Sequence, residues 1–422
     1  MAGSIHGQTA TSLIHYRALQ NTRNVGACLQ ANRPGPGAEK IKTNRKRMKK
    51  INWYPPVILG LLALLVLTFG ALVVSRSTQE QKITTLENTG QQTFEWKLVT
   101  TWPKNFPGLG SAPERFAKKV EEMSNGRLKI KVYGAGELVP AMGVFGAVSD
   151  GAAQVGHGAA YYWKGKLPAA QFFTAVPFGL NAQEMNGWLH YGGGLKLWEE
   201  LYAPFNLIPM AGGSTGVQMA GWFNREINSV ADLQGLKMRI PGLGGDVLNR
   251  AGGTAVTIPG GELYTALQTG VIDATEWVGP YNDLAFGFHQ IAKYYYYPGW
   301  HEPGSILEII INKTAFEKLP KDLQAIVRTA ARDANQDMLD EYTARNNRAL
   351  KELVEQHGVE LRKLPDDVIA HLKTINDQIM QETAARDPQF NRVYKAFKEF
   401  ESQVIPYHRI SEEAYYQTRA IQ

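Results

Sequence analysis

The chain has 422 residues and a formal net charge of +6, but the charge is unevenly distributed. Residues 1–89 contain 12 Lys or Arg and 3 Glu, which leaves 33 basic and 36 acidic side chains in the rest of the chain. Because this body has no basic excess, a nucleic-acid-binding function loses its main support. The length exceeds what one hydrophobic core usually supports, which predicts two lobes or domains.

The N-terminal region has the order of residues that is typical of an export signal. Basic residues between positions 45 and 50 precede an uncharged apolar run from Val57 to Val74, and polar residues follow it. The run is near the lower length limit of a membrane span, so residues 48–76 are either a signal peptide or a membrane anchor, and we favour cleavage. Residues 1–47 form a basic extension that an over-long start-codon assignment would explain. This charge order places residues 90–422 outside the cytoplasm, in the periplasm.

The only cysteine, Cys28, lies in the N-terminal region. The body therefore has no disulfide framework, no cysteine nucleophile and no thiolate metal site. These classes of site are excluded for residues 90–422.

The body opens with a strand, a helix and a second strand. Residues 94–99 and 128–132 have strand patterns, and Ser111 begins a helix of the S-x-x-E type that Asn125-Gly126 ends. This βαβ order is typical of a parallel sheet. Further strands are predicted at residues 152–160, 205–210, 217–223, 235–241, 255–258 and 306–312, and further helices at residues 138–149, 183–203, 246–251 and 262–269.

The pattern becomes helical after residue 313. Residues 320–357 form one long amphipathic helix that Gly358 ends, and helices at 366–385 and 389–404 follow. No internal repeat or low-complexity linker interrupts the body. The fold class is therefore α/β, with two interleaved lobes joined by crossing strands and a helical C-terminal region.

Arg239 and Glu276 are the most informative polar residues, because each lies beside an abrupt break in the chain pattern. An arginine fork matches a carboxylate through two parallel hydrogen bonds, so Arg239 is a candidate for binding a small acid. An internal salt bridge with Glu276 is the alternative. A bound acid also requires either a cation such as Na⁺ or Ca²⁺, held by Glu276 and oxygens such as the Gln218 amide, or an ammonium group on the ligand. The residues alone leave these alternatives open.

Other motifs carry weaker signals. Gly212 to Gly216 match G-x-S-x-G, but a serine nucleophile at Ser214 requires a following helix, whereas a strand pattern follows here. A secreted serine hydrolase that uses Ser214 and a histidine such as His301 is therefore the disfavoured alternative. His157, among small residues, is interpreted as a core histidine.

Several segments in the same order resemble a known family. GLKMRIPG, ALQTGVIDATEWVGP and AAQVGHGAAYYWKG resemble signatures of the extracytoplasmic solute receptors of TRAP transporters, the DctP family. TWPKNFPGLG, GVQMAGWFN, EWVGPYND and YYYYPGW are similar to its branch that binds 2-oxoacids and lactate. The resemblance covers roughly residues 92–410.

The resemblance implies a two-lobed periplasmic-binding-protein architecture, the Venus-flytrap type, without catalytic activity. Such a receptor closes on a small monocarboxylate and delivers it to the small and large permease subunits in the membrane. It also implies a homodimer through a C-terminal helix in some members, for which residues 320–357 are the candidate here. A receptor for an amino acid or another organic acid, without a metal, is the alternative.

The resemblance also implies roles for individual residues. Arg239 matches the carboxylate-binding arginine, and Gln218, Glu276 and the main chain of Trp277 match the ligands of a metal ion, expected to be Na⁺ or Ca²⁺. Gln218 and Trp277 are also expected to contact the bound acid. Three further pocket positions match Tyr161, Tyr162 and Asn282. The segment WHEPGS departs from the family pattern, so its residues His301 and Glu302 are expected to influence ligand preference.

Overall fold

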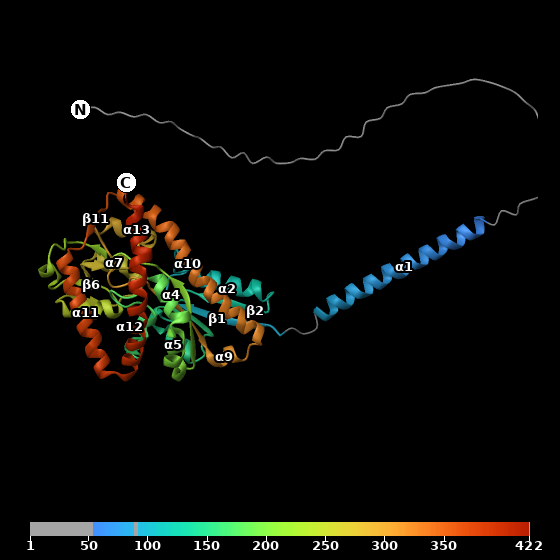
Figure 1. Cartoon of the computed structure of the whole chain (residues 1–422), viewed down its shortest axis with the longest axis horizontal. Coiled ribbons are helices and arrows are strands. Elements are labelled where there is room, and N and C mark those ends of the chain that lie inside the picture. Colours follow the sequence, from blue (N-terminus) through green and yellow to red (C-terminus); the bar gives the residue numbers. More distant parts are fainter. Residues whose placement is uncertain (1–53, 88–91, 422) are drawn as a thin grey trace, which may run out of the picture. The chain divides into compact units, whose positions relative to one another are not determined.

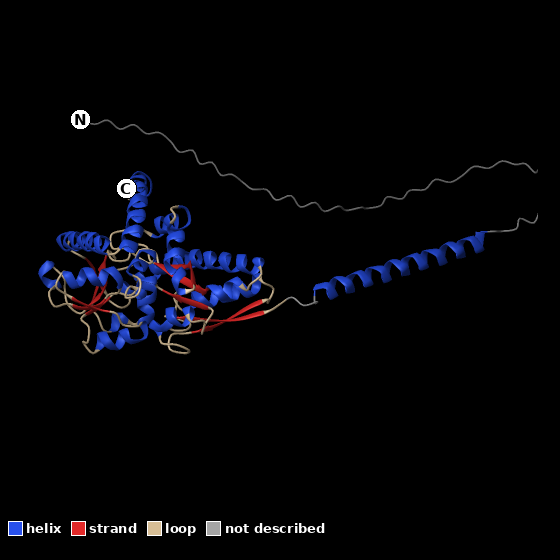
Figure 2. Ribbon diagram, turned by 90° about the horizontal axis from the view of Figure 1, so that it is seen from below, coloured by secondary structure: helices blue, strands red, loops and turns tan. Residues whose placement is uncertain are grey.

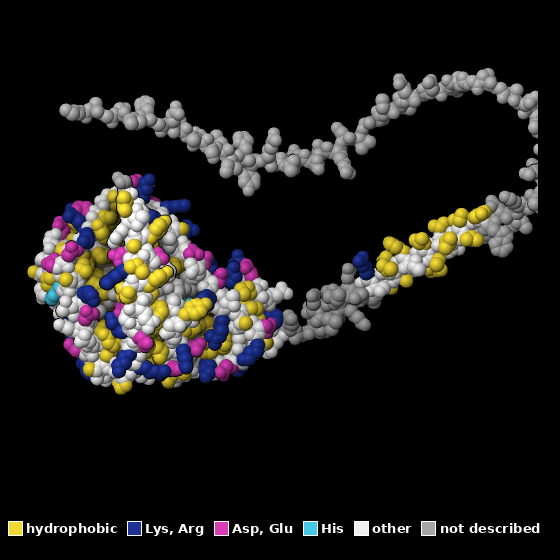
Figure 3. All heavy atoms as spheres, viewed as in Figure 1, with side chains coloured by type: hydrophobic (Ala, Val, Ile, Leu, Met, Phe, Trp, Pro, Cys, Tyr) yellow, Lys and Arg dark blue, Asp and Glu magenta, His cyan; other side chains and the backbone are white. Residues whose placement is uncertain are grey.

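The computed structural model describes residues 54–87 and 92–421. The chain divides into two compact units, Met1–Thr84 and Thr85–Gln422. In the first unit, helix α1 (Tyr54–Glu87) contains a stretch, Val57–Arg76, that is long and apolar enough to cross a membrane. Its apolar side chains are exposed (Figure 3). A signal sequence has the same properties, so signal and anchor both stay open, and the predicted extension 1–47 lies outside the described residues.

The second unit contains two sheets flanked by helices (Figures 1 and 2). Sheet A has the strand order β2-β1-β3-β10-β4. β1 is parallel to β2 and β3, as the opening βαβ pattern predicts, whereas β10 is antiparallel to both of its neighbours. The strands of sheet A are β1 (Phe94–Thr100), β2 (Leu128–Tyr133), β3 (Val155–Gly158), β4 (Leu207–Ser214) and β10 (Ile306–Asn312).

Sheet B has the strand order β11-β9-β5-β8-β6-β7. β6 is parallel to β7 and β8, and β5 is antiparallel to β8 and β9. The strands of sheet B are β5 (Gly221–Phe223), β6 (Lys237–Arg239), β7 (Thr254–Val256), β8 (Ala274–Thr275), β9 (Tyr294–Tyr297) and β11 (Glu360–Lys363).

The chain passes between the two sheets three times, so the two lobes are interleaved, but the crossings are two irregular segments and a helix instead of the predicted crossing strands. Residues 215–220 lead from β4 to β5, and residues 298–305 lead from β9 back to β10. Helix α10 (Lys321–Glu355) then leads to β11, and it contacts β4 and α2 on one side and α8 on the other.

Helices cover the sheets. The long helix α10 and the two helices after it confirm the predicted helical C-terminal region, and α12 continues through a π-helical turn (Arg409–Glu413) into α13. The remaining helices are α2 (Ser111–Met123), α3 (Val144–Ser149), α4 (Ala182–Tyr191), α5 (Gly194–Tyr202), α6 (Gly242–Arg250), α7 (Leu263–Gln268), α8 (Pro280–Phe286), α9 (Lys313–Glu317), α11 (Asp366–Arg386), α12 (Pro388–His408) and α13 (Ala414–Arg419).

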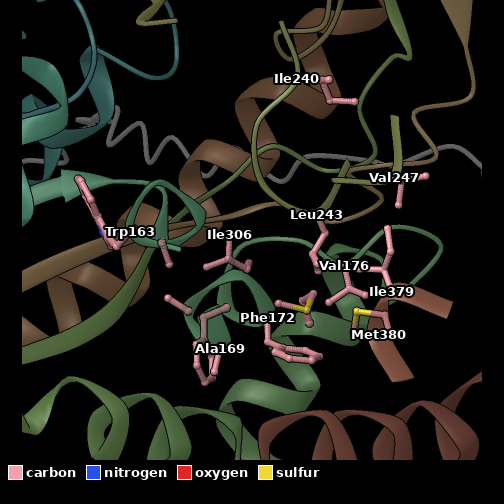
Figure 4. Close-up of a cluster of buried hydrophobic side chains, with 14 of the residues drawn as sticks. Trp163, Ala169, Phe172, Val176, Ile240, Leu243, Val247, Ile306, Ile379 and Met380 are labelled. Carbon is pink, nitrogen blue, oxygen red and sulfur yellow. The ribbon is translucent and has the colours of Figure 1, made fainter. Parts of the chain in front are cut away.

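One hydrophobic cluster joins both lobes (Figure 4). Trp163 and Phe172 belong to the segment after β3, Leu243 belongs to α6 beside sheet B, and Met380 belongs to α11. Burial of such side chains stabilises the fold by about 1.5–3 kcal/mol each. Because one cluster contains residues of both lobes, the space between the sheets is bounded by well-packed elements.

Three predicted elements differ from the structure. Residues 183–203 form two helices, α4 and α5, because Gly192 and Gly193 interrupt the predicted single helix. Residues 217–223 were expected to be one strand, but only Gly221–Phe223 pair within a sheet, because the preceding residues form the crossing between lobes. The predicted helix 138–149 is α-helical only from Val144, after a short 3₁₀ turn at Ala141–Gly143.

Candidate functional site

Arg239 and Glu276 lie side by side at the ends of neighbouring strands. Arg239 is the last residue of β6, and Glu276 follows directly after β8. β6 and β8 are parallel, and Arg239 is in register with Thr275. Parallel strands bring their carboxyl ends to the same edge of a sheet. The two strand ends therefore meet at one edge of sheet B.

The two side chains form a buried ion pair. One nitrogen of the Arg239 guanidinium, Nη1, donates to the Glu276 carboxylate and to the Glu276 main-chain oxygen at 3.2 Å, and Nη2 donates to the Tyr162 hydroxyl at 3.2 Å. The guanidinium also lies 5.0 Å from the centre of the Trp277 ring. Arg239 and Glu276 have side chains 1% and 0% exposed. The alternative of an internal salt bridge is thus realised in this structure.

Burial and charge oppose each other at Arg239. Burial lowers the pKa of the guanidinium, but the adjacent Glu276 raises it, and the result is a pKa above the ordinary arginine value. Arg239 therefore stays charged. A fixed buried cation at the end of a strand is suited to hold a carboxylate.

A second polar group lies on the two crossings between lobes. The Gln218 side-chain amide donates to the Glu302 carboxylate at 2.7 Å, and the Ser305 hydroxyl donates to the same carboxylate. Main-chain bonds link the same two crossings, from Gln218 N to Glu302 O at 3.2 Å and from Thr215 N to Ser305 O at 3.0 Å. All four of these residues are buried. The candidate site is therefore attached to both segments that connect the lobes.

A small cavity lies between these groups. It is narrow, with a volume of about 10 Å³, and its polar lining comes from Arg239, Gln218, Glu302 and Thr215. Its aromatic and aliphatic lining residues are Trp102, Tyr161, Tyr162, Trp277, Leu109, Val278 and Leu307. Apolar walls with a few converging polar groups are typical of small-molecule sites.

A wider groove on the surface has a different character. It is lined by residues of α10, β4 and α5, among them Met210 and Arg328, and has a volume of about 550 Å³. The groove is open and mostly apolar, and Arg328 pairs with Glu199 near its edge. We therefore place the candidate site in the smaller cavity, where buried charged groups converge.

Two acidic residues and one histidine gather beside the cavity. Atoms of Glu276, His301 and Glu302 that are able to ligate a metal lie within 4.8 Å of one another, and His301 Nε2 is 3.4 Å from the Glu276 carboxylate. Burial, then the charge of Glu276, raise the pKa of Glu302 to about 7. A cation near these two carboxylates would offset their repulsion.

The chemistry of the oxygen donors fits a hard cation. The side-chain oxygen Oε1 of Gln218 is buried and has no hydrogen-bond partner among the described residues. Buried polar atoms without a partner are rare in folded proteins, and one in a cavity points to a bound ion or ligand. Amide, carboxylate and main-chain oxygens are ligands that Na⁺ and Ca²⁺ prefer. Gln218, Glu276 and the main chain of Trp277 together supply this set of donors.

Most of the residues predicted from the sequence lie together. Tyr161, Tyr162, Gln218, Arg239 and Trp277 line the cavity, and Glu276 borders it through its ion pair with Arg239.

Asn282 is placed differently. It does not line the cavity, because its side-chain nitrogen donates to the Pro107 carbonyl at 2.8 Å and its oxygen accepts from the Tyr342 hydroxyl at 2.6 Å. Asn282 thus ties α8 to α10 and to the loop before α2.

Trp102, Thr215 and Ser305 are site residues that the sequence analysis did not identify. Trp102 lies in the segment TWPKNFPGLG, which carried part of the resemblance, and Ser305 closes the departing segment WHEPGS. The position of Trp102 in the cavity and the contact of Ser305 with Gln218 depend on long-range packing, whereas Thr215 lies only three residues from Gln218.

The structure also tests the interpretations of His157 and Ser214. His157 is fully buried, accepts a hydrogen bond from Trp102 Nε1 at 2.8 Å and has its pKa lowered by burial to about 4, as a neutral core histidine does. Ser214 is the last residue of β4, and a crossing and then β5 follow it, not a helix. Ser214 is fully buried, so the nucleophile geometry of a G-x-S-x-G hydrolase is not present.

Two further carboxylates are buried outside the candidate site. Burial raises the pKa of Asp283 and of Glu308 to about 7. Asp283 accepts from the Tyr295 hydroxyl at 2.6 Å behind the Trp277 loop, and Glu308 accepts from Trp163 Nε1 and from the Tyr202 hydroxyl. Neither carboxylate lines the cavity.

Comparison with known proteins identifies the family of the chain. A model of the family described as bacterial extracellular solute-binding protein, family 7 (DctP), matches residues 98–387. The chain is 46% identical over 326 residues to the monocarboxylate 2-oxoacid-binding periplasmic protein of Nostoc sp., and the alignment covers 77% of this chain and 89% of that protein.

Two crystal structures of TRAP periplasmic solute-binding proteins are similar over the body. The protein from Pseudoalteromonas atlantica, with bound sodium and pyruvate, and the protein from Colwellia psychrerythraea, with bound calcium and pyruvate, are each 44% identical. Each comparison has a TM-score of 0.76 and covers 78% of this chain and 100% of the other. With a family model that matches more than half of its length, the chain belongs to the DctP family of extracytoplasmic TRAP solute receptors, which bind solutes and are not enzymes.

Proposed function

We propose that the protein captures a small monocarboxylate, such as a 2-oxo or 2-hydroxy acid, together with a cation in the cavity beside Arg239. The observation that carries the proposal is a buried arginine, paired with Glu276, that lines the same cavity as Gln218, whose amide oxygen has no partner among the described residues. The similar proteins that bind pyruvate with sodium or calcium support the same assignment.

Arg239 holds the carboxylate of the ligand in this proposal. Its guanidinium is anchored from behind by the Ile258 carbonyl, which accepts from Nε at 3.4 Å, and it lies against the Trp277 ring. Tyr161 and Tyr162 line the same cavity, where their rings exclude water. Exclusion of water strengthens the charge contacts inside the site.

A count of charges explains the cation. With its carboxylates ionised, the site holds one guanidinium and two carboxylates, from Arg239, Glu276 and Glu302. A monocarboxylate increases the net negative charge of the site. A bound Na⁺ reduces this net charge, and a bound Ca²⁺ cancels it. Gln218, Glu276 and the Trp277 main chain would hold this ion, and when bound it supplies positive charge between Glu276 and the ligand.

An amino-acid receptor without a metal is the second candidate. It would place the ligand ammonium group on Glu276 and the ligand carboxylate on Arg239, so the same residues serve both readings. The amide oxygen of Gln218 would then accept from the ammonium group.

Receptors of this family act outside the cytoplasm with membrane permease subunits. We propose that the lobes close on the ligand by bending at residues 215–220 and 298–305 and that the closed form docks on the small and large subunits. A hinge of this kind is favoured by contacts that the ligand makes with both lobes.

The proposed homodimer is assigned to the last helices. Helix α10 packs on both lobes, whereas apolar side chains are exposed near the C-terminal end, at Tyr407 in α12, Ile410 in the π-helical turn, Tyr416 in α13 and Ile421. Gathered exposed apolar residues are typical of protein-interaction surfaces. Light scattering of residues 85–422 should give a dimer that Ile410→Asp converts to a monomer, and a monomeric unmodified protein would contradict this assignment.

The ligand proposal is tested by what the protein retains through purification. Native mass spectrometry and metal analysis should find a 2-oxo or 2-hydroxy acid with sodium or calcium in equal amounts. Calorimetry with pyruvate should give micromolar affinity or tighter, about −8 kcal/mol or beyond. A co-purified amino acid with no metal would favour the second candidate instead.

A further inference from the structure

The orientation of the Gln218 amide is set by its neighbours. Its nitrogen, Nε2, lies within hydrogen-bond distance of three oxygens: Thr215 Oγ1 at 3.2 Å, Ser305 Oγ at 3.3 Å and the Glu302 carboxylate at 2.7 Å. Its oxygen, Oε1, has no partner among the described residues. The amide nitrogen is therefore surrounded by hydrogen-bond acceptors, whereas the amide oxygen lacks a partner among the described residues.

With Glu302 ionised, each of the three neighbours is able only to accept a hydrogen bond from Gln218. The Thr215 hydroxyl uses its proton on the Gly216 carbonyl at 3.0 Å, and the Ser305 hydroxyl uses its proton on the Glu302 carboxylate. The Glu302 oxygen that accepts from Ser305 is the same one that accepts from Gln218. An amide oxygen turned toward these groups would face acceptors only, which is unfavourable for a buried group.

We propose that Glu302 is a positioning residue that turns the oxygen of the Gln218 amide toward the cavity, where it meets a cation. The inference rests on the proposed function and deepens it, because it names the residue that makes the amide a cation ligand. Glu302 acts through Gln218 in this scheme and is not itself the ligand. The side chain of Glu302 holds the amide nitrogen, and the amide oxygen is left on the opposite side.

This arrangement also couples the ligand site to the crossings between lobes. Gln218 belongs to the first crossing, and Glu302 and Ser305 belong to the second. Gln218 and Glu302 are joined by a side-chain hydrogen bond and also by a main-chain hydrogen bond at 3.2 Å. Both bonds hold the two crossings together. The amide is therefore oriented correctly only while the two crossings lie together.

The test is a double-mutant cycle read by calcium affinity. Calcium chloride is titrated by calorimetry into metal-free protein in the presence of excess pyruvate, for the unmodified protein, Glu302→Gln, Gln218→Ala and the double variant. Glu302→Gln places an amide beside the Gln218 amide, so either end of Gln218 is able to face the cavity. We expect calcium affinity to fall at least tenfold in Glu302→Gln. No further loss of calcium affinity is expected when Glu302→Gln is added to Gln218→Ala, because the effects of substitutions at interacting residues are not additive.

A reciprocal exchange and a control complete the design. In Gln218→Glu/Glu302→Gln the new carboxylate presents an oxygen in either orientation and the new amide supplies its donor, so affinity should recover to within threefold of the unmodified protein. Glu308→Gln makes the same chemical change at a buried carboxylate outside the cavity and should leave affinity within twofold. Circular dichroism melting without calcium reports whether each variant folds.

The outcomes separate the two proposals. The positioning role is overturned if the unmodified protein binds calcium but Glu302→Gln changes its affinity less than threefold. Additive losses in the cycle, or an exchange variant no better than Glu302→Gln, also overturn it, because they assign Glu302 a charge or structural role independent of Gln218. If pyruvate binds the unmodified protein equally well with and without any cation, both the cation proposal and the positioning role fail.

Discussion

Substitutions of the buried pair Arg239 and Glu276 are predicted to change protein stability and ligand binding in different ways. Both side chains are almost fully buried, and His301 Nε2, at 3.4 Å, is the other side-chain partner of the Glu276 carboxylate among the described residues. Arg239→Met removes the guanidinium and leaves a buried carboxylate without its charged partner. Such a change costs about 3–5 kcal/mol of unfolding free energy.

A second substitution should return much of this loss. Glu276→Gln, added to Arg239→Met, removes the unpaired charge, and replacement of both members of a buried ion pair by neutral groups is often close to neutral. We therefore expect the unfolding free energy of the double variant to exceed that of Arg239→Met by about 2 kcal/mol or more, measured in urea without ligand or cation.

Binding should follow a different order. A carboxylate held by two charge-assisted hydrogen bonds depends on Arg239 for about 3–6 kcal/mol, so Arg239→Met should weaken pyruvate binding by roughly 10²-fold or more in calorimetry. The double variant should recover stability but not binding. Arg239→Lys, which keeps the charge but lacks the fork, is the matched control and should lose at least about tenfold in affinity. Pyruvate binding within threefold of the unmodified protein in Arg239→Met would refute the role of this residue.

Three further predictions concern the surroundings of the site. An added Cβ at Gly260 would lie 2.4 Å from the Trp277 ring, so Gly260→Ala should weaken pyruvate binding about tenfold by overpacking, whereas Gly261→Ala, which meets nothing within 4 Å, should not. Because burial raises the pKa of Glu308 to about 7, this group stabilises the fold below its unfolded pKa near 4.5, and that contribution is lost as the pH rises through 7. Between pH 5 and pH 8 the unmodified protein should lose about 3 kcal/mol more unfolding free energy than Glu308→Gln, as measured by urea unfolding at both pH values. Ser214→Ala should leave pyruvate binding unchanged in calorimetry, and a loss above tenfold would revive a functional role for this serine.

The fold class was accessible from the sequence because its signal is local. Alternation at residues 128–132 and the helix beginning at Ser111 are visible within short windows, and their order predicts a parallel unit of sheet A. The crossing at residues 217–220 was not accessible. Its main-chain nitrogens donate to Glu302, Val278 and Tyr296 in turn, and such scattered partners leave no periodic pattern in the sequence.

The site was partly accessible for the same physical reason. Pattern breaks identified Arg239 and Glu276, and the ends of parallel strands brought them together. The contact of Glu302 with Gln218 was not predicted, because 84 positions separate them and only the return of the chain between sheets places them together. Asn282 shows the converse, since its motif matched the family while its side chain contacts Pro107 and Tyr342.

The central claim is that Glu276 exchanges Arg239 for a cation when the acid binds. A crystal structure of the protein with pyruvate and calcium tests it most directly. The account predicts the pyruvate carboxylate on the Arg239 guanidinium and a calcium ion held by oxygens of Gln218, Glu276 and the Trp277 main chain. A structure with pyruvate bound, no cation in the cavity and Glu276 still paired with Arg239 would contradict it.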